Sequence, residues 1–283
     1  MTTRQQSLPP IGHPSRGDVY IINLNRMLLA GTAIGVLFFL LLPVVIVIPM
    51  SFSESSSLQF PPQGFSLRWY AQVFSDAGWL AAIKTSSILA ILSSTLALVL
   101  GSLGAYGLTR GTSKGRDLLQ SNFIAPLIIP SVILAVALYM ALSAAGLLGS
   151  FFGLLLAHTL LGVPYVVLIM SVAIRSFDER IEQVAFTLGA SWTAMFTHVL
   201  LPNLLPSAAA AWIFAFVTSF DEVVITNFVA GTHETLPKRM FNELILQVNP
   251  GITAIATVLI CVSLVLMTVA ARLNHHPRID SNH

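Results

Sequence analysis

Two adjacent carboxylates, Asp221 and Glu222, are the side chains of this sequence best suited to chemistry. They are the only acidic residues inside the apolar stretches that are long enough to cross a bilayer. An ionised carboxylate near mid-membrane costs about 2.5–3.5 kcal/mol on insertion scales, so it needs compensation. Three interpretations are open: ion pairing with Lys84, Lys238 or Arg239, a proton relay, or a water-facing path for an organic cation.

Other reactive constellations are missing from the sequence. It contains no G-x-x-x-x-G-K-[ST] phosphate loop, no H-E-x-x-H, no G-x-S-x-G and no Cys/His cluster suited to zinc. His158 is the only histidine inside an apolar stretch, and both a structural hydrogen bond and a polar cavity lining are open for it. We therefore expect no enzyme activity and no cofactor bound by this chain. Any driving energy must come from a partner or an ion gradient.

The composition places the chain in a membrane. Hydrophobic residues make up 55% of it and charged residues only 9%, whereas soluble domains carry about 25% charged residues. So little polar surface cannot cover a water-facing globule. The 14 Lys and Arg residues are dispersed, and no basic block suggests nucleic acid as a partner. We expect an all-α membrane protein surrounded by lipid.

Apolar runs separated by charges predict six transmembrane helices. The stretch 123–174 carries no charge, and as one helix it would be roughly 78 Å long, so it must form two spans. The predicted spans are 27–50, 85–109, 123–142, 151–174, 204–229 and 252–271. Residues 1–26 and 272–283 are polar tails.

The distribution of Lys and Arg predicts the orientation. Ten of the 14 lie on the side of the two termini and four on the other side. Because Lys and Arg accumulate in cytoplasmic loops, both termini are expected in the cytoplasm. The polar loop 175–203 then lies in the cytoplasm as well.

That loop contains the segment Phe177–Pro202, which reads FDERIEQVAFTLGASWTAMFTHVLLP. Acidic residues crowd the start of a helical stretch, where carboxylates favour the positive end of the helix dipole. Gly189 then breaks the stretch, a second short helix runs from Ser191 to about His198, and Pro202 halts it. A simple interfacial link between two spans would explain this helical hairpin equally well.

The loop resembles the cytoplasmic signature of permease subunits of binding-protein-dependent ABC importers. That signature reads E-A-A, three residues, Gly, nine residues, then I-x-L-P. Here Gly189 is followed by nine residues and then V-L-L-P, while Q-V-A falls on E-A-A and Glu182 precedes it as a possible substitute for the glutamate of the family. The positions that the resemblance assigns to the coupling loop are Glu182, Gln183, Ala185, Gly189, Val199, Leu201 and Pro202.

Three further stretches are similar to the spermidine/putrescine permeases, especially to the second of their two permease subunits. They are residues 60–70, residues 157–167 and the Ser-Phe-Asp-Glu-Val-Val-Ile segment at 219–225. The resemblance implies a type I ABC importer permease of MetI-like architecture that moves a polyamine by alternating access, with Asp221 and Glu222 on its path. The alternatives are a permease of the same family for another small solute, or a proton-coupled carrier that uses Asp221, Glu222 and His158.

The same resemblance implies the partners. A dimer of cytoplasmic ABC ATPase subunits would receive the coupling loop and use the ATP, and a second homologous permease subunit would complete the channel. A periplasmic substrate-binding protein would deliver the cargo. The chain would then be a multi-pass protein of the bacterial inner membrane.

Overall fold

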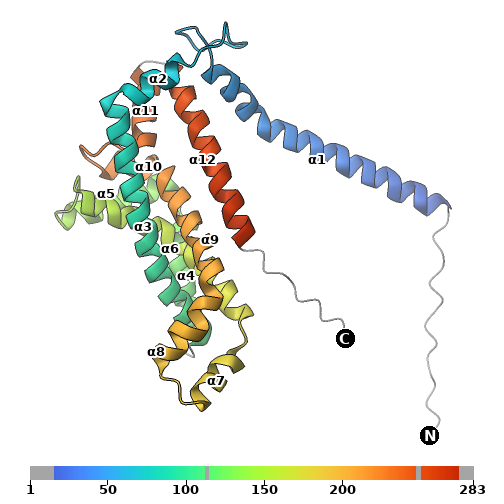
Figure 1. Ribbon diagram of the computed structural model, residues 1–283, viewed down its shortest axis with the longest axis vertical. Coiled ribbons are helices and arrows are strands. Elements are labelled where there is room, and N and C mark those ends of the chain that lie inside the picture. The colour runs from blue at the N-terminus through green and yellow to red at the C-terminus, as the bar shows by residue number, and fades with distance from the viewer. Residues whose placement is uncertain (1–15, 112–114, 247–249, 274–283) are drawn as a thin grey trace. The chain divides into compact units, whose positions relative to one another are not determined.

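A computed structural model describes residues 16–111, 115–246 and 250–273. Within these residues the regular structure is helical and contains no strand (Figure 1), which confirms the predicted all-α class. The helices are α1 (Arg16–Ser51), α2 (Arg68–Ser75), α3 (Ala77–Arg110), α4 (Arg116–Ile128), α5 (Ser131–Ala144), α6 (Phe151–Ser176), α7 (Glu179–Thr187), α8 (Trp192–Met195), the π-helical turn η1 (Phe196–Leu200), α9 (Leu201–Phe220), α10 (Val224–Val229), α11 (Leu236–Leu246) and α12 (Gly251–Leu273).

The chain divides into two compact units, Met1–Pro49 and Met50–His283, which are described separately. The helix of the first unit is α1, whose segment Asn25–Ser51 is long and apolar enough to cross a membrane. This helix begins at Arg16, before the predicted span starts, because hydropathy marks the apolar stretch and not the helix end. The rest of the predicted N-terminal tail, and the predicted C-terminal tail beyond residue 273, lie outside the described residues.

Three long helices, α3, α6 and α9, form the packed core of the second unit (Figure 1). Small residues allow their backbones to approach closely. A Cβ atom added at Gly162 would lie 2.9 Å from Cβ of Ala97 and 3.3 Å from Cβ of Ala215. Helices in a membrane are held together by such close packing because lipid is as apolar as the side chains themselves.

Most of the predicted spans coincide with long helices. Helix α3 contains the stretch 85–109, α6 contains 151–174 and α12 contains 252–271. Together with α1 and the continuous helical segment Trp192–Phe220, five helices of the described residues are long and apolar enough to cross a membrane.

The predicted third span, 123–142, is not one straight helix. Helix α4 ends at Ile128, α5 begins at Ser131, and the two are bent by 109°. Pro130 lies in the break, where it donates no backbone hydrogen bond and disfavours a helical conformation for the residue before it. The described residues therefore provide a sixth span only if this bent pair counts as one.

The predicted fifth span, 204–229, is broken too. Helix α9 ends at Phe220, and α10 begins only at Val224. Asp221 and Glu222 therefore lie in a break between two helices, and the expectation that they are neighbours within one helix is wrong. The apolar run hid the break, because hydropathy records the polarity of residues and not their conformation.

The two ends of the second unit differ in their elements (Figure 1). Helices α2 and α11 lie at one end, where the guanidinium of Arg239 is 4.8 Å from the Trp79 ring centroid. Arg239 also pairs with Asp76 at 3.3 Å, Glu234 at 3.1 Å and Glu243 at 3.7 Å. These contacts fasten the junction of α2 and α3 to α11.

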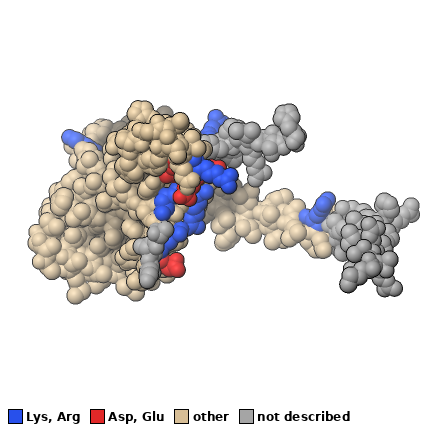
Figure 2. Space-filling model, turned by 90° about the horizontal axis from the view of Figure 1, so that it is seen from below, with Lys and Arg blue, Asp and Glu red and all other residues tan. Residues whose placement is uncertain are grey.

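Helices α7 and α8 lie at the opposite end. Figure 2 views the molecule from this end and shows charged side chains gathered mainly in one region, with few elsewhere on the described surface. The helices that begin or end here contribute Arg110, Arg116, Arg175 and Arg180. This concentration of arginine is the pattern expected of a cytoplasmic face.

Candidate functional site

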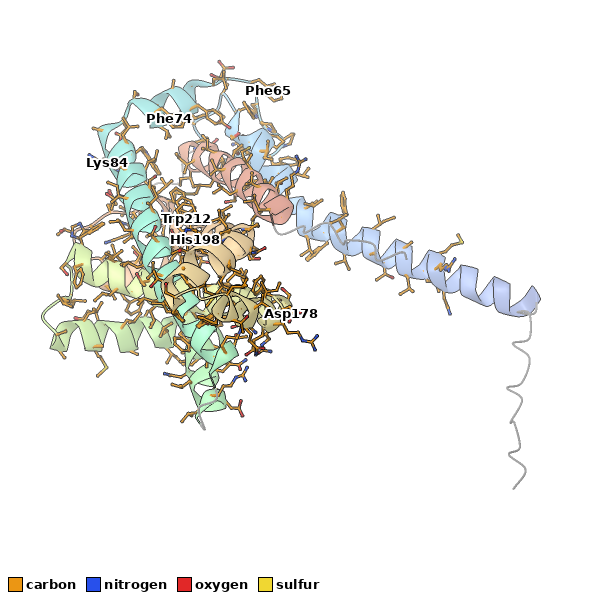
Figure 3. All side chains as sticks on the ribbon, turned by 60° about the horizontal axis from the view of Figure 1, so that its bottom comes forward. Phe65, Phe74, Lys84, Asp178, His198 and Trp212 are labelled. Carbon is orange, nitrogen blue, oxygen red and sulfur yellow. The ribbon has the colours of Figure 1, made fainter. Side chains whose placement is uncertain are left out.

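The loop between α6 and α9 is a hairpin of two short helices, as predicted. Asp178, labelled in Figure 3, precedes α7, and its Oδ1 accepts a hydrogen bond of 2.9 Å from the amide of Arg180. Ser191 caps α8 by accepting from the amide of Ala194 at 3.2 Å. Between the two helices, Gly189 has a φ of +89°, a conformation that residues with a Cβ rarely adopt. The predicted turn at Gly189 is thus confirmed.

The segment after the hairpin differs from the prediction, because Pro202 does not halt the second helix. Helices α8, η1 and α9 follow one another without a break from Trp192 to Phe220. Pro202 lies inside this continuous segment, where it removes a backbone hydrogen bond without ending the helix. The π-helical turn Phe196–Leu200 precedes it and absorbs the change in hydrogen-bond register. A single helical rod therefore joins the loop to the interior of the unit.

Glu182 fastens the hairpin to α3. Its Oε1 accepts hydrogen bonds from Nη2 and Nε of Arg110 at 2.7 and 3.0 Å, and its Oε2 accepts from the Tyr106 hydroxyl at 3.2 Å. Arg110 Nη2 also donates to the carbonyl of Phe177 at 3.0 Å. Glu182 is only 5% exposed. It faces inward and bonds to α3, so its carboxylate is not presented at the surface of the hairpin.

The other predicted loop positions are divided between the interior and the surface. Ala185 packs against the core cluster, and Gln183 is exposed. Beyond the hairpin, Val199 is half-buried, while Leu201 and Pro202 are exposed.

Sequence reasoning missed an exposed apolar face on α7. Ile181, Val184 and Leu188 are 46%, 54% and 82% exposed, and Trp192 of α8 is 53% exposed. The spacing of the first three residues at i, i+3 and i+7 marks one helical face and would have revealed it. Large apolar side chains gathered beside Gln183 at a polar end of the molecule indicate a surface that contacts another protein.

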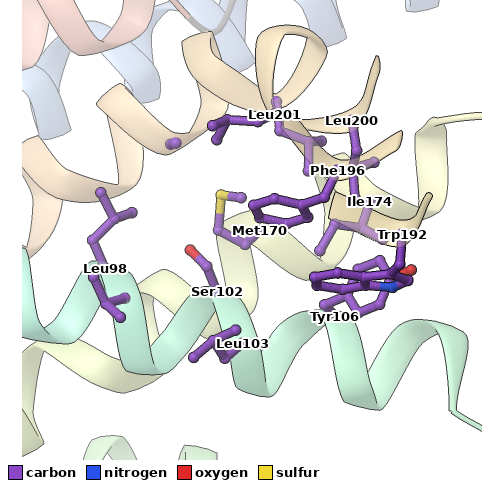
Figure 4. A pocket seen from close by; sticks show the side chains of 13 residues that line it. Leu98, Ser102, Leu103, Tyr106, Met170, Ile174, Trp192, Phe196, Leu200 and Leu201 are labelled. Carbon is purple, nitrogen blue, oxygen red and sulfur yellow. The ribbon is translucent and has the colours of Figure 1, made fainter. Parts of the chain in front are cut away.

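An apolar pocket of about 360 Å³ lies behind the hairpin (Figure 4). Its lining includes Tyr106, Met170 and Ile174, together with Trp192 and Phe196, whose rings are stacked with their centroids 5.3 Å apart. Its lining includes no charged side chain, so this pocket does not suit a charged solute.

The two carboxylates in the break between α9 and α10 have different surroundings. Glu222 Oε1 accepts a hydrogen bond of 2.7 Å from the amide of Ile225 and so caps α10. Asp221 ends α9 and is exposed. Among the described residues its carboxylate makes no hydrogen bond or ion pair. Of the pair, Asp221 is the exposed carboxylate without a hydrogen-bonded partner.

A buried network lies behind this break. Nδ1 of His158 is hydrogen-bonded to the Ser219 hydroxyl at 2.8 Å, and Nε2 to the Thr226 hydroxyl at 3.0 Å. Ser93 donates to Ser219 at 2.9 Å. His158 is 1% exposed and joins α6 to α9, α10 and α3. This is the structural hydrogen-bonding role that the sequence left open, and the ring contacts hydroxyls rather than carboxylates.

Two of the three basic residues expected as partners of Asp221 and Glu222 are engaged elsewhere. Arg239 pairs within the cluster at the α2/α11 end. The Lys238 ammonium donates to the carbonyls of Gly231 at 2.7 Å and His233 at 3.3 Å. Burial lowers the pKa of Lys238, and Glu234 partly opposes this shift. Over the described part of the chain, no Lys or Arg forms an ion pair with either carboxylate, so the ion-pair interpretation fails.

The sequence is similar to known proteins. Residues 93–279 match the family described as binding-protein-dependent transport system inner membrane component. The spermidine/putrescine transport system permease protein PotC of Escherichia coli (strain K12) is 31% identical over 260 residues, which cover 92% of this chain and 98% of PotC. The putrescine transport system permease protein PotI of the same organism is 34% identical over 230 residues, which cover 78% and 82%.

The fold is also found among solved structures. The crystal structure of a bacterial ABC transporter involved in the import of the acidic polysaccharide alginate matches with a TM-score of 0.70 and 17% identity, over 93% of this chain and all of that one. The helical architecture, the hairpin at the α7/α8 end and the family match agree with one another. The chain therefore belongs to the binding-protein-dependent transport system inner membrane components, the multi-pass permease subunits of ABC importers.

Proposed function

We propose that this permease moves a polyamine, or a closely similar small organic cation, into the cell by alternating access. One observation carries the proposal: a continuous helical rod runs from Trp192 in the hairpin to Phe220, and the next residue is the unpaired Asp221. The surface suited to a partner and the carboxylate suited to a cation are thus joined mechanically. The names of PotC and PotI support the choice of cargo.

The hairpin is suited to transmitting motion. The ion pair between Glu182 and Arg110 fixes α7 to α3, and the turn at Gly189 keeps the hairpin short. The apolar face of Ile181, Val184 and Leu188, with Gln183 beside it, is the surface that would enter a groove of a cytoplasmic ATPase subunit. Closure of an ATPase dimer would then push directly on the rod and on α3.

The unpaired carboxylate in the break between α9 and α10 favours a cationic cargo. An exposed, unpaired carboxylate compensates part of the hydration that an ammonium group loses as it enters the protein. Glu222 shapes the path by holding α10 in place. An anionic solute would be repelled at the same position.

The remaining components follow from the family. The α7/α8 end, with its arginines, would face the cytoplasm, and we expect both termini on that side. The ATP would be bound by a separate ATPase dimer, since this chain carries no phosphate loop and we expect it to bind no cofactor. A second permease subunit would complete the channel, and a periplasmic protein would deliver the cargo at the α2/α11 end.

Reconstitution tests the proposal. The chain is placed in liposomes alone, or with its second permease, ATPase and binding protein, and uptake of labelled spermidine is measured with and without ATP. We expect uptake only by the complete complex and only with ATP. Accumulation by the chain alone, abolished by an uncoupler, would establish the proton-coupled carrier instead. ATP-driven uptake of another solute and not of spermidine would overturn the choice of cargo.

A further inference from the structure

A column of aromatic rings runs along α9 toward Asp221. Trp212, Phe216 and Phe220 are spaced four residues apart, so they lie on one side of the helix. Successive ring centroids are 5.4 Å apart, with interplanar angles of 24° and 17°. The three rings form one stacked column, which we call the aromatic column.

The aromatic column is held from two sides. On one side, Nε1 of Trp212 donates to the Thr95 hydroxyl of α3 at 3.1 Å (Figure 3 labels Trp212). On the other side, Phe216 and Phe220 line a narrow cleft with Val262 of α12. All three rings are half-buried, so each is fixed in position while part of its surface stays open.

Asp221 continues the aromatic column. It is the residue directly after Phe220, it is exposed, and it lines the same cleft as Phe216 and Phe220. The cleft itself is only about 20 Å³, room for roughly one water, so a larger ligand must lie on the open side of the rings. An unpaired carboxylate is strongly disfavoured against hydrocarbon, and this position indicates that the strip of α9 faces water rather than lipid.

We propose that the aromatic column and Asp221 form a binding track for a linear polyamine, an inference that rests on the proposed function. One ammonium group would pair with the Asp221 carboxylate. The methylene groups of the chain would lie along the open edges of the Phe220, Phe216 and Trp212 rings, because the stacked faces are turned towards one another. The track recognises a chain that alternates charge with apolar spacers, and it discriminates against a compact inorganic cation.

The test uses the complete reconstituted importer and labelled spermidine. Phe216→Leu and Phe220→Leu keep an apolar side chain but remove the ring. We expect each to raise the spermidine concentration for half-maximal uptake about three- to tenfold, because leucine removes part of the ring surface that the methylene groups contact. Phe216→Tyr keeps the ring and should retain uptake. Phe214→Leu is the matched control, because Phe214 lies on the opposite side of α9 and is 37% exposed.

A second measurement reports contact directly. In a Cys261→Ala background, which removes the only cysteine, Phe216→Cys and Phe214→Cys are treated with a cationic thiol reagent. We expect spermidine to slow modification at position 216 and not at position 214. Equal uptake by Phe216→Leu, Phe220→Leu and the wild type, or no protection at position 216, would overturn the track. Normal spermidine uptake in those variants would leave the proposed function intact, whereas no spermidine uptake by the wild type would overturn both.

Discussion

The hairpin at the α7/α8 end and the break at the end of α9 each contain two adjacent polar residues, one fixed and one open. In the hairpin, Glu182 is buried against Arg110 and Gln183 is exposed. In the break, Glu222 caps α10 and Asp221 is exposed. The two regions differ in how far along the chain the hydrogen-bond partner of the fixed residue lies. Glu182 bonds to a separate long helix, whereas Glu222 bonds only three residues ahead, and His158 of α6 connects the break to the bundle instead.

The largest expected effect follows from breaking the ion pair between Glu182 of the hairpin and Arg110 of α3. Glu182→Ala leaves Arg110 in a mostly buried position without its partner, and losing one member of such a pair destabilises a protein by about 3–5 kcal/mol. We expect a clear drop in the thermal unfolding midpoint of the purified permease and loss of transport.

Gln183→Ala is the matched control, because it alters the neighbouring exposed side chain and should leave the midpoint unchanged. Arg110→Ala should resemble Glu182→Ala, and the double variant should be no worse than either single variant. Additive losses in the double variant would show that the two side chains do not act as one unit.

A smaller effect is expected from the turn of the hairpin. At Gly189 an added Cβ meets nothing within 4 Å, so Gly189→Val acts through the backbone alone, at about 1–2 kcal/mol for the left-handed conformation. The two helices of the hairpin should reorient, and ATP hydrolysis by the complete importer should continue while uptake falls. The ratio of cargo moved to ATP hydrolysed measures this uncoupling.

Asn tolerates the left-handed conformation better than other residues with a side chain, so Gly189→Asn should keep most of the coupling. If Gly189→Val transports normally, the hairpin is not the element that transmits closure of the ATPase.

The smallest effect concerns the break. Asp221→Asn removes a charge without removing a structural contact, so it should reduce polyamine uptake about tenfold with no change in the unfolding midpoint. Glu222→Gln retains an oxygen that can still cap α10, so it should change uptake less. A lower midpoint with unchanged uptake in Asp221→Asn would assign this residue a structural role and overturn its place on the path.

Local patterns in the sequence predicted much of this molecule. The all-helical membrane class follows from composition, and α3, α6 and α12 follow from uncharged runs bounded by charges. The turn at Gly189 follows from the special conformational freedom of glycine. Each of these features depends on residues close together in the chain.

Two of the features that sequence analysis missed depend on residues far apart. Glu182 faces inward because Arg110, 72 residues earlier, reaches it, and no pattern within the loop reveals that partner. The break after Phe220 is supported by His158, which contacts Ser219 and Thr226 from 61 and 68 residues away. Hydropathy predicted one continuous helix through the break at Pro130 and another through the break after Phe220, because it averages the polarity of residues over a window.

The π-helical turn Phe196–Leu200 has a mechanical consequence for this permease. It lies in the helical rod between the hairpin and the main part of α9, followed at once by Pro202 and then by Pro206. Proline removes backbone hydrogen bonds, so the rod is most compliant in the turns beside the apolar pocket. A torque applied at the hairpin will therefore first wind or unwind this segment. Asp221 will rotate only after the segment has deformed.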